Sequence, residues 1–208
     1  QILYFYNLRT QSNYIKNPFL PLALSSLLFL LSGLLSAYCY CRFYDFGGIF
    51  MPGIIYTSST ILLFVSFQIP VRGKEWLMYF LKMNLIYLIV WVLTMISSWF
   101  VIIFGVLTAG GGATSTFILT DKAITKFPFS RTAVFIAGGM SFVLVDIISL
   151  DYDFSLTDYL FNRNWSFSIF LADIFIFWQL ITGIMLAIHL RKSQISQNEA
   201  MDPDSVEP

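Results

Sequence analysis

Residues 76–120 read WLMYFLKMNLIYLIVWVLTMISSWFVIIFGVLTAGGGATSTFILT, and this stretch decides the fold. The 38 residues from Met83 to Thr120 carry no charge. A helix that crosses a membrane needs about 20 apolar residues, so this run is too long for one ordinary span and just long enough for two. The run therefore indicates an α-helical protein with several membrane spans, and their number depends on how this stretch is divided.

The composition of the whole chain favours the same fold class. Hydrophobic residues make up 57% of the 208 residues and charged residues only 12%, whereas soluble domains carry about 25% charged residues. A soluble fold of this size could not bury so much apolar surface, but a lipid bilayer accepts it. The formal net charge is zero, so we expect no nucleic-acid partner. We predict an all-α, polytopic transmembrane helical bundle.

Apolar segments separated by short polar turns predict where the spans lie. We expect a short interfacial segment over residues 1–17, one transmembrane domain that extends to residue 192, and a polar, acidic tail over residues 193–208. The composition of this tail is typical of disorder unless a partner holds it. The predicted spans cover about residues 19–40, 49–69, 77–96, 99–120, 132–150 and 165–190.

The long uncharged run can be divided in two ways. One tilted helix that ends near Leu107 gives five spans, and a turn near Ser97 and Ser98 gives six. Six spans place ten of the twelve Lys and Arg residues on one side of the membrane, whereas five spans place six on each side. Because Lys and Arg next to spans mark the cytoplasmic side, we favour six spans with both termini in the cytoplasm. This bias fits an inner (cytoplasmic) membrane or its equivalent.

Two carboxylates, Asp146 and Asp173, lie inside the last two predicted spans. An ionisable group within a membrane segment costs a few kcal/mol or more and usually faces the bundle interior or water. Both aspartates are roughly 7 to 12 Å from the loop that joins their spans, at 1.5 Å per helical residue. One interpretation is a shared proton or cation site. The other is a pair of carboxylates that hydrogen bond to neighbours.

Gly110, Gly111 and Gly112 lie within the predicted fourth span, among small and hydroxyl side chains. A glycine run at membrane depth can break a helix and offer backbone groups to a substrate, as in transporters. The sequence lacks the Gly-Lys-Ser/Thr of a phosphate-binding loop. We therefore consider two roles for this run: a broken helix on a substrate path, or a flexible or closely packed segment without a ligand.

Residue types that bind metals or carry catalysis are sparse. Cys39 and Cys41 are poorly placed to bridge each other, and no nearby thiol or imidazole completes a zinc site. His189 is the only histidine, which excludes ligation of a haem by two histidines of this chain. Asp151 and Asp153 begin like a calcium loop, but the Gly and Glu that such a loop needs are absent. We expect no metal, no cofactor and no catalytic residues.

Small residues four apart occur in the first and last spans, as Gly33 with Ala37 and Gly183 with Ala187. Such pairs allow close contact between membrane helices. They favour a non-catalytic integral membrane subunit that packs against other integral membrane subunits in a larger complex. The alternative is a small transporter or channel-forming subunit that uses the two aspartates and the glycine run. A third interpretation is a lipid-modifying enzyme with a metal on the acidic loop.

Overall fold

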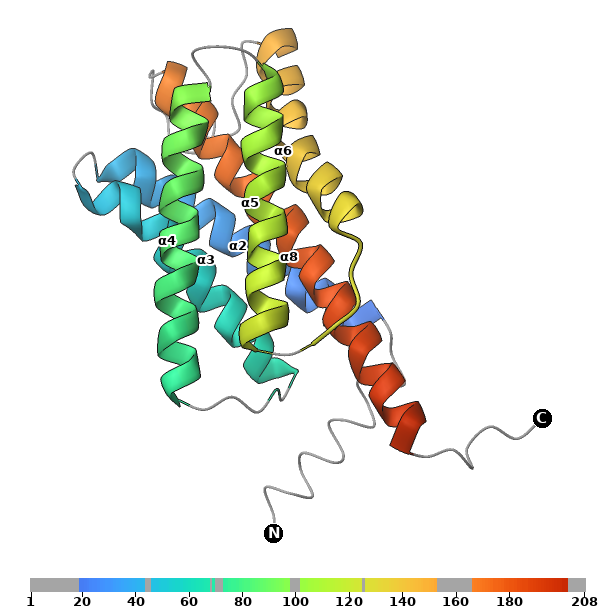
Figure 1. Ribbon diagram of the computed structural model, residues 1–208. Coiled ribbons are helices and arrows are strands. Elements are labelled where there is room, and N and C mark those ends of the chain that lie inside the picture. The colour runs from blue at the N-terminus through green and yellow to red at the C-terminus, as the bar shows by residue number, and fades with distance from the viewer. Residues whose placement is uncertain are drawn as a thin grey trace.

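The computed structural model is a bundle of long helices (Figure 1). It describes residues 19–43, 46–67, 69, 73–97, 102–124, 126–152 and 166–201. Within these ranges the elements are α2 (Phe19–Arg42), α3 (Phe46–Ser66), α4 (Gly73–Ser97), α5 (Ile102–Ala123), α6 (Arg131–Tyr152) and α8 (Ser166–Met201). Six helices of this described part are long and apolar enough to cross a membrane. The predicted fold class and the predicted six spans are confirmed.

The long uncharged run divides where the charge pattern predicted. α4 ends at Ser97 and α5 begins at Ile102. The two helices have 25 and 22 residues, which at about 1.5 Å per residue suits a hydrocarbon core about 30 Å thick. Since neither glycine nor proline occurs between them, helix length rather than turn chemistry decides this division.

The helices form a closed ring in which each one packs against the next along the chain. α8 completes the ring by packing on both α6 and α2, and it also reaches α3 and α5. In Figure 1, α4 and α5 stand side by side, and α2 and α8 pass behind them at a steep angle. The span of α8 is 61% buried within the bundle, against 22% for that of α4. The core of the protein therefore surrounds the middle of α8.

The small residues of the first and last spans allow α2 and α8 to approach closely. A Cβ atom on Gly33 would lie 2.7 Å from the Cα atom of Ile176. A Cβ atom on Gly183 would overlap the ring of Phe29. Ala37 is fully buried and packs with Ile176. Gly33, Ala37 and Gly183 therefore lie where α2 and α8 are in close contact.

Positive charge gathers at one end of the bundle, which we call the cationic end. α4 begins at this end, and α5 and α8 run towards it (Figure 1). Arg42 lies at the opposite end, where α2 finishes. The other cations with described side chains belong to the start of α4, the end of α5, the connection to α6 with its first residue, and the second half of α8: Lys74, Lys82, Lys122, Lys126, Arg131, Arg191 and Lys192. This is the one-sided arrangement that predicted six spans, and its assignment to the cytoplasm stays a prediction.

α8 continues past its predicted end. It is helical through Met201, so the expectation of disorder is wrong for residues 193–201. A helix that has already formed extends at little cost, and this stretch contains no glycine or proline until Pro203, before which helices usually end. The predicted interfacial segment over residues 1–17 and residues 202–208 lie outside the described residues.

Candidate functional site

The glycine run does not break its helix. α5 is continuous from Ile102 to Ala123, so the alternative of a glycine-broken helix is wrong, and a substrate path along this run stays a prediction. In a bilayer, no water replaces a lost intrahelical hydrogen bond, and this keeps glycine-rich segments helical. The hydroxyl of Thr114 also donates a hydrogen bond to the carbonyl of Gly110 (2.9 Å). That of Thr116 donates to the carbonyl of Gly112 (3.0 Å).

Two of the three glycines serve helix packing instead. A Cβ atom on Gly110 would lie 2.6 Å from the backbone oxygen of Phe135 in α6. A Cβ atom on Gly112 would lie 2.7 Å from a methyl group of Val90 in α4. Gly111 has no atom within 4 Å of such a Cβ position. The run therefore lets α5 contact the helices on both of its sides.

The two aspartates lie on packed helices but in different surroundings. Asp173 is buried in α8, with 2% of its surface exposed, whereas Asp146 of α6 is half-buried. The last turns of α6 and the first turns of α8 lie apart in Figure 1. Ile174 and Phe175, the two residues after Asp173, line a small cavity between α4, α5 and α8, but neither aspartate belongs to its lining. A shared ion or proton site stays a prediction.

The polar centre of the bundle is Gln179, which lies in the middle of α8 and is fully buried. Its side-chain amide nitrogen donates to Ser36 Oγ (2.9 Å) and to Tyr87 Oη (3.1 Å). Its amide oxygen accepts from Ser32 Oγ (2.7 Å). The same nitrogen lies 3.5 Å from the carbonyl oxygen of Pro52. The amide thus has a partner at each donor and at its acceptor, and it joins α8 to α2, α3 and α4.

A second set of hydrogen bonds involves Trp178, which precedes Gln179, and Thr182, which lies about one turn after it. The hydroxyl of Tyr56 in α3 donates to Thr182 Oγ1 (3.2 Å), which itself donates to the carbonyl of Trp178 (2.6 Å). The indole Nε1 of Trp178 donates to the carbonyl of Ala109 in α5 (3.0 Å). The rings of Tyr56, Tyr87 and Trp178 are in mutual contact, with centroids 5.2 to 6.0 Å apart. One polar and aromatic cluster therefore connects α8 to α3, α4 and α5.

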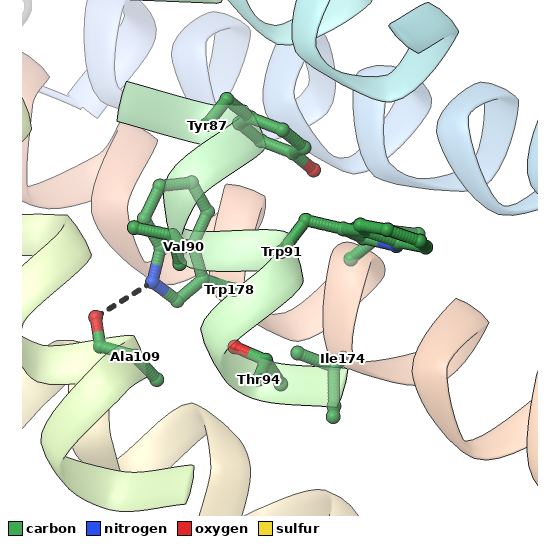
Figure 2. A pocket seen from close by; sticks show the side chains of 8 residues that line it. Tyr87, Val90, Trp91, Thr94, Ala109, Ile174 and Trp178 are labelled. Atoms are coloured by element: carbon green, nitrogen blue, oxygen red, sulfur yellow. Dashed lines mark hydrogen bonds between the residues drawn. The ribbon is translucent and has the colours of Figure 1, made fainter. Parts of the chain in front are cut away.

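A cavity of about 30 Å³ lies beside this cluster, between α4, α5 and α8 (Figure 2). Figure 2 shows the indole of Trp178 turned towards Ala109, and that of Trp91 pointing away from it. The Nε1 atom of Trp91 is the one buried side-chain nitrogen or oxygen in the described part of the chain that has no hydrogen-bond partner. A cavity of this size holds about one water molecule and no organic substrate.

The cluster has the chemistry of a structural element. Amide, hydroxyl and indole groups donate and accept hydrogen bonds, but none of them is a strong acid, base or nucleophile. Over the described residues, no group of three or more His, Cys, Asp or Glu side chains could hold a metal ion. Cys39 and Cys41 are buried, and neither forms a disulfide bond within the described part of the chain. His189 Nδ1 lies 2.7 Å from the carbonyl of Met185, and the His189 ring packs edge-on against Phe117.

Gln179 and its partners were not among the residues predicted from the sequence. The available signal was a single amide side chain in an otherwise apolar part of the last span, next to Trp178. An uncharged amide within a span is a weaker signal than an aspartate, although an unpaired amide in hydrocarbon costs several kcal/mol and must find partners.

Comparisons with protein-family models, with curated proteins and with solved structures find no match.

Proposed function

We propose that the protein is a non-catalytic integral membrane subunit that packs against partner membrane proteins in a larger complex. The observation that carries this proposal is the Gln179 amide, whose partners lie on three other helices. A transporter alternates between two packings of its helices around a site near the midplane of the membrane. Movement of α8 against α2 or α4 would leave this buried amide unpaired, so the cluster favours one fixed arrangement.

The far end of α8 supports the role of a docking subunit. With 36 residues, α8 is about 54 Å long, whereas the hydrocarbon core of a bilayer is about 30 Å thick. In Figure 1 its last turns extend past the ends of α3 and α5. Ser193 Oγ still donates to the carbonyl of Lys126 (3.3 Å), and residues 194–199 are polar except for Ile195. A polar helix that projects from the bundle offers a surface for a partner outside the bilayer.

α4 supplies a second candidate surface, within the membrane. Its span is only 22% buried by the rest of the chain, and large apolar side chains cover its outer face. The exposed residues are Leu77, Met78, Leu81, Leu85, Ile89, Val92, Leu93 and Ile96. This face suits a membrane helix of another subunit as well as lipid.

The experiment that tests the proposal compares the size of the assembly in native membranes. The full chain and a chain that ends at Ser193 are each solubilised in mild detergent and separated by native electrophoresis. We expect the full chain in a larger assembly and the shortened chain at the size of the folded subunit. If the full chain migrates alone, or if removal of residues 194–208 leaves the assembly intact, docking through α8 is wrong.

Proton or cation transport is the second candidate function, because Asp173 is buried within a span. The matched test is the double variant Asp146→Asn with Asp173→Asn, reconstituted in liposomes that contain a pH-sensitive dye. A docking subunit gives the same slow proton leak with or without the substitutions, and the double variant still enters the larger assembly. Fast proton entry that the double variant abolishes would replace the docking proposal with transport.

A further inference from the structure

A second, larger cavity lies at the cationic end of the bundle. It is a groove of about 250 Å³ between the start of α2, the end of α3 and the last membrane turns of α8. Its walls are largely apolar and include Pro21 and Leu22 of α2, Phe67 after α3, and Ile188 of α8. Leu22 and Ile188 are half-buried and Lys192 is exposed, so the groove opens to the surface of the bundle.

Two adjacent cations, Arg191 and Lys192, also line the groove. Lys192 is exposed and Arg191 is half-buried. They follow directly on the apolar part of α8, at the depth where a bilayer changes from hydrocarbon to headgroups. Glu75 and Asp121, the acidic side chains described on α4 and α5, do not line the groove. Among its lining residues, the charged ones are Arg191 and Lys192.

We propose that this groove binds an anionic phospholipid, with an acyl chain along the apolar wall and the phosphate at Arg191 and Lys192. An arginine guanidinium matches a phosphate with two parallel hydrogen bonds, and a lysine adds a compact charge. Basic pockets between membrane helices recognise anionic headgroups in this way. A free phosphate ion would gain nothing from the apolar wall, so the whole groove fits a lipid better than an inorganic anion.

This inference needs only the placement of the helices in a bilayer and is independent of the proposed docking role. Each Lys or Arg near an anionic lipid favours binding about fivefold, so two of them give a preference of roughly 30-fold over a zwitterionic lipid. The groove joins α2, α3 and α8, and a bound lipid therefore also holds the first and last described helices together.

The test measures lipids retained by the full chain in native mass spectrometry, with phosphatidylglycerol and phosphatidylcholine titrated separately. The variant R191Q/K192Q removes both cations of the groove. The matched control K74Q/K82Q removes two cations of the same end that lie on α4, outside the groove. The variant Leu22→Trp fills the apolar part and leaves both cations in place.

We expect the wild type and K74Q/K82Q to prefer phosphatidylglycerol by roughly 30-fold, as two cations near the phosphate imply, and R191Q/K192Q to lose this preference. Leu22→Trp should retain less of both lipids. Equal retention of the two lipids by the wild type overturns the proposal, and so does an equal loss in K74Q/K82Q. Binding of inorganic phosphate as tight as that of phosphatidylglycerol, unchanged in Leu22→Trp, would assign the cations to a free anion instead.

Discussion

The side-chain amide of Gln179 donates a hydrogen bond to the phenolic oxygen of Tyr87 (3.1 Å), and this contact joins α8 to α4 through the centre of the bundle. Both residues belong to a cluster of hydroxyl, amide and indole groups inside an otherwise apolar protein. Apolar side chains alone do not hold membrane helices in a unique arrangement, because lipid is as apolar as they are. Directional bonds of this kind select one packing.

The variant Gln179→Met keeps most of the side-chain volume and removes the bonds to Ser32, Ser36 and Tyr87. Side-chain hydrogen bonds in membrane proteins contribute about 0.6 kcal/mol each on average, so we expect a loss of about 2 kcal/mol in the free energy of unfolding. Titration with denaturing detergent in mixed micelles measures it. Ser32→Ala removes one of these bonds and should cost about a third as much. Equal stability of Gln179→Met and the wild type would show that the amide does not hold the helices.

Substitution of neighbouring glycines by alanine should have opposite effects. Gly110→Ala forces α5 away from the backbone of Phe135, and such overpacking costs about 1–3 kcal/mol. Gly111→Ala meets open space and should raise the free energy of unfolding by up to about 1 kcal/mol through better helix propensity. The same detergent titration compares the two. Equal effects of both substitutions would mean that close packing of α5 on α6 is not what these glycines provide.

The two tryptophans beside the central cavity give a matched pair. Trp178→Phe removes the hydrogen bond to the Ala109 carbonyl, whereas Trp91→Phe removes an indole N–H that has no partner. A typical hydrogen bond contributes about 1 kcal/mol, and a buried unpaired donor costs about 1–3 kcal/mol. We therefore expect Trp178→Phe to destabilise the protein. In Trp91→Phe, the removal of the unpaired donor offsets the loss of ring volume, so its stability should be close to that of the wild type. Thermal unfolding in detergent ranks the two, and the reverse order would contradict the assignment of these indoles.

Labelling of single cysteines checks the orientation of the bundle. The background carries Ala in place of Cys39 and Cys41, and Lys126→Cys, Lys192→Cys or Phe43→Cys is added to it. Lys126 and Lys192 lie at the cationic end and Phe43 lies beyond the other end of α2. If the cationic end faces the cytoplasm, a reagent that cannot cross the membrane labels only Phe43→Cys in intact cells. Labelling of Lys126→Cys and Lys192→Cys from outside would reverse the predicted orientation.

The sequence predicted the helices well because their number depends on local properties. The apolar length of residues 76–120 and the one-sided distribution of Lys and Arg required a turn near Ser97, and α4 ends there. The contact faces at Gly33 and Gly183 were also visible, because small residues at helical spacing have few other uses in a membrane.

The centre of the bundle could not be predicted in the same way. The role of Gln179 depends on hydroxyl groups of Ser32 and Ser36, more than 140 residues earlier in the chain, and only the packing of α2 on α8 brings them together. The role of Gly110 likewise depends on which helix lies beside α5. The glycine run considered without its neighbours suggests a broken helix, but in the folded protein it is a surface on which α6 packs.

The closure of the ring by α8 also has a consequence for biosynthesis. α2 emerges from the ribosome before the other described helices and α8 emerges after them, yet their mutual packing is the most extensive in the bundle. Until translation delivers α8, the Ser32 and Ser36 side chains of an inserted chain lack the amide that they bond in the finished protein. The inserted nascent chain therefore lacks these hydrogen bonds of Ser32 and Ser36, and synthesis of α8 completes the core of the protein.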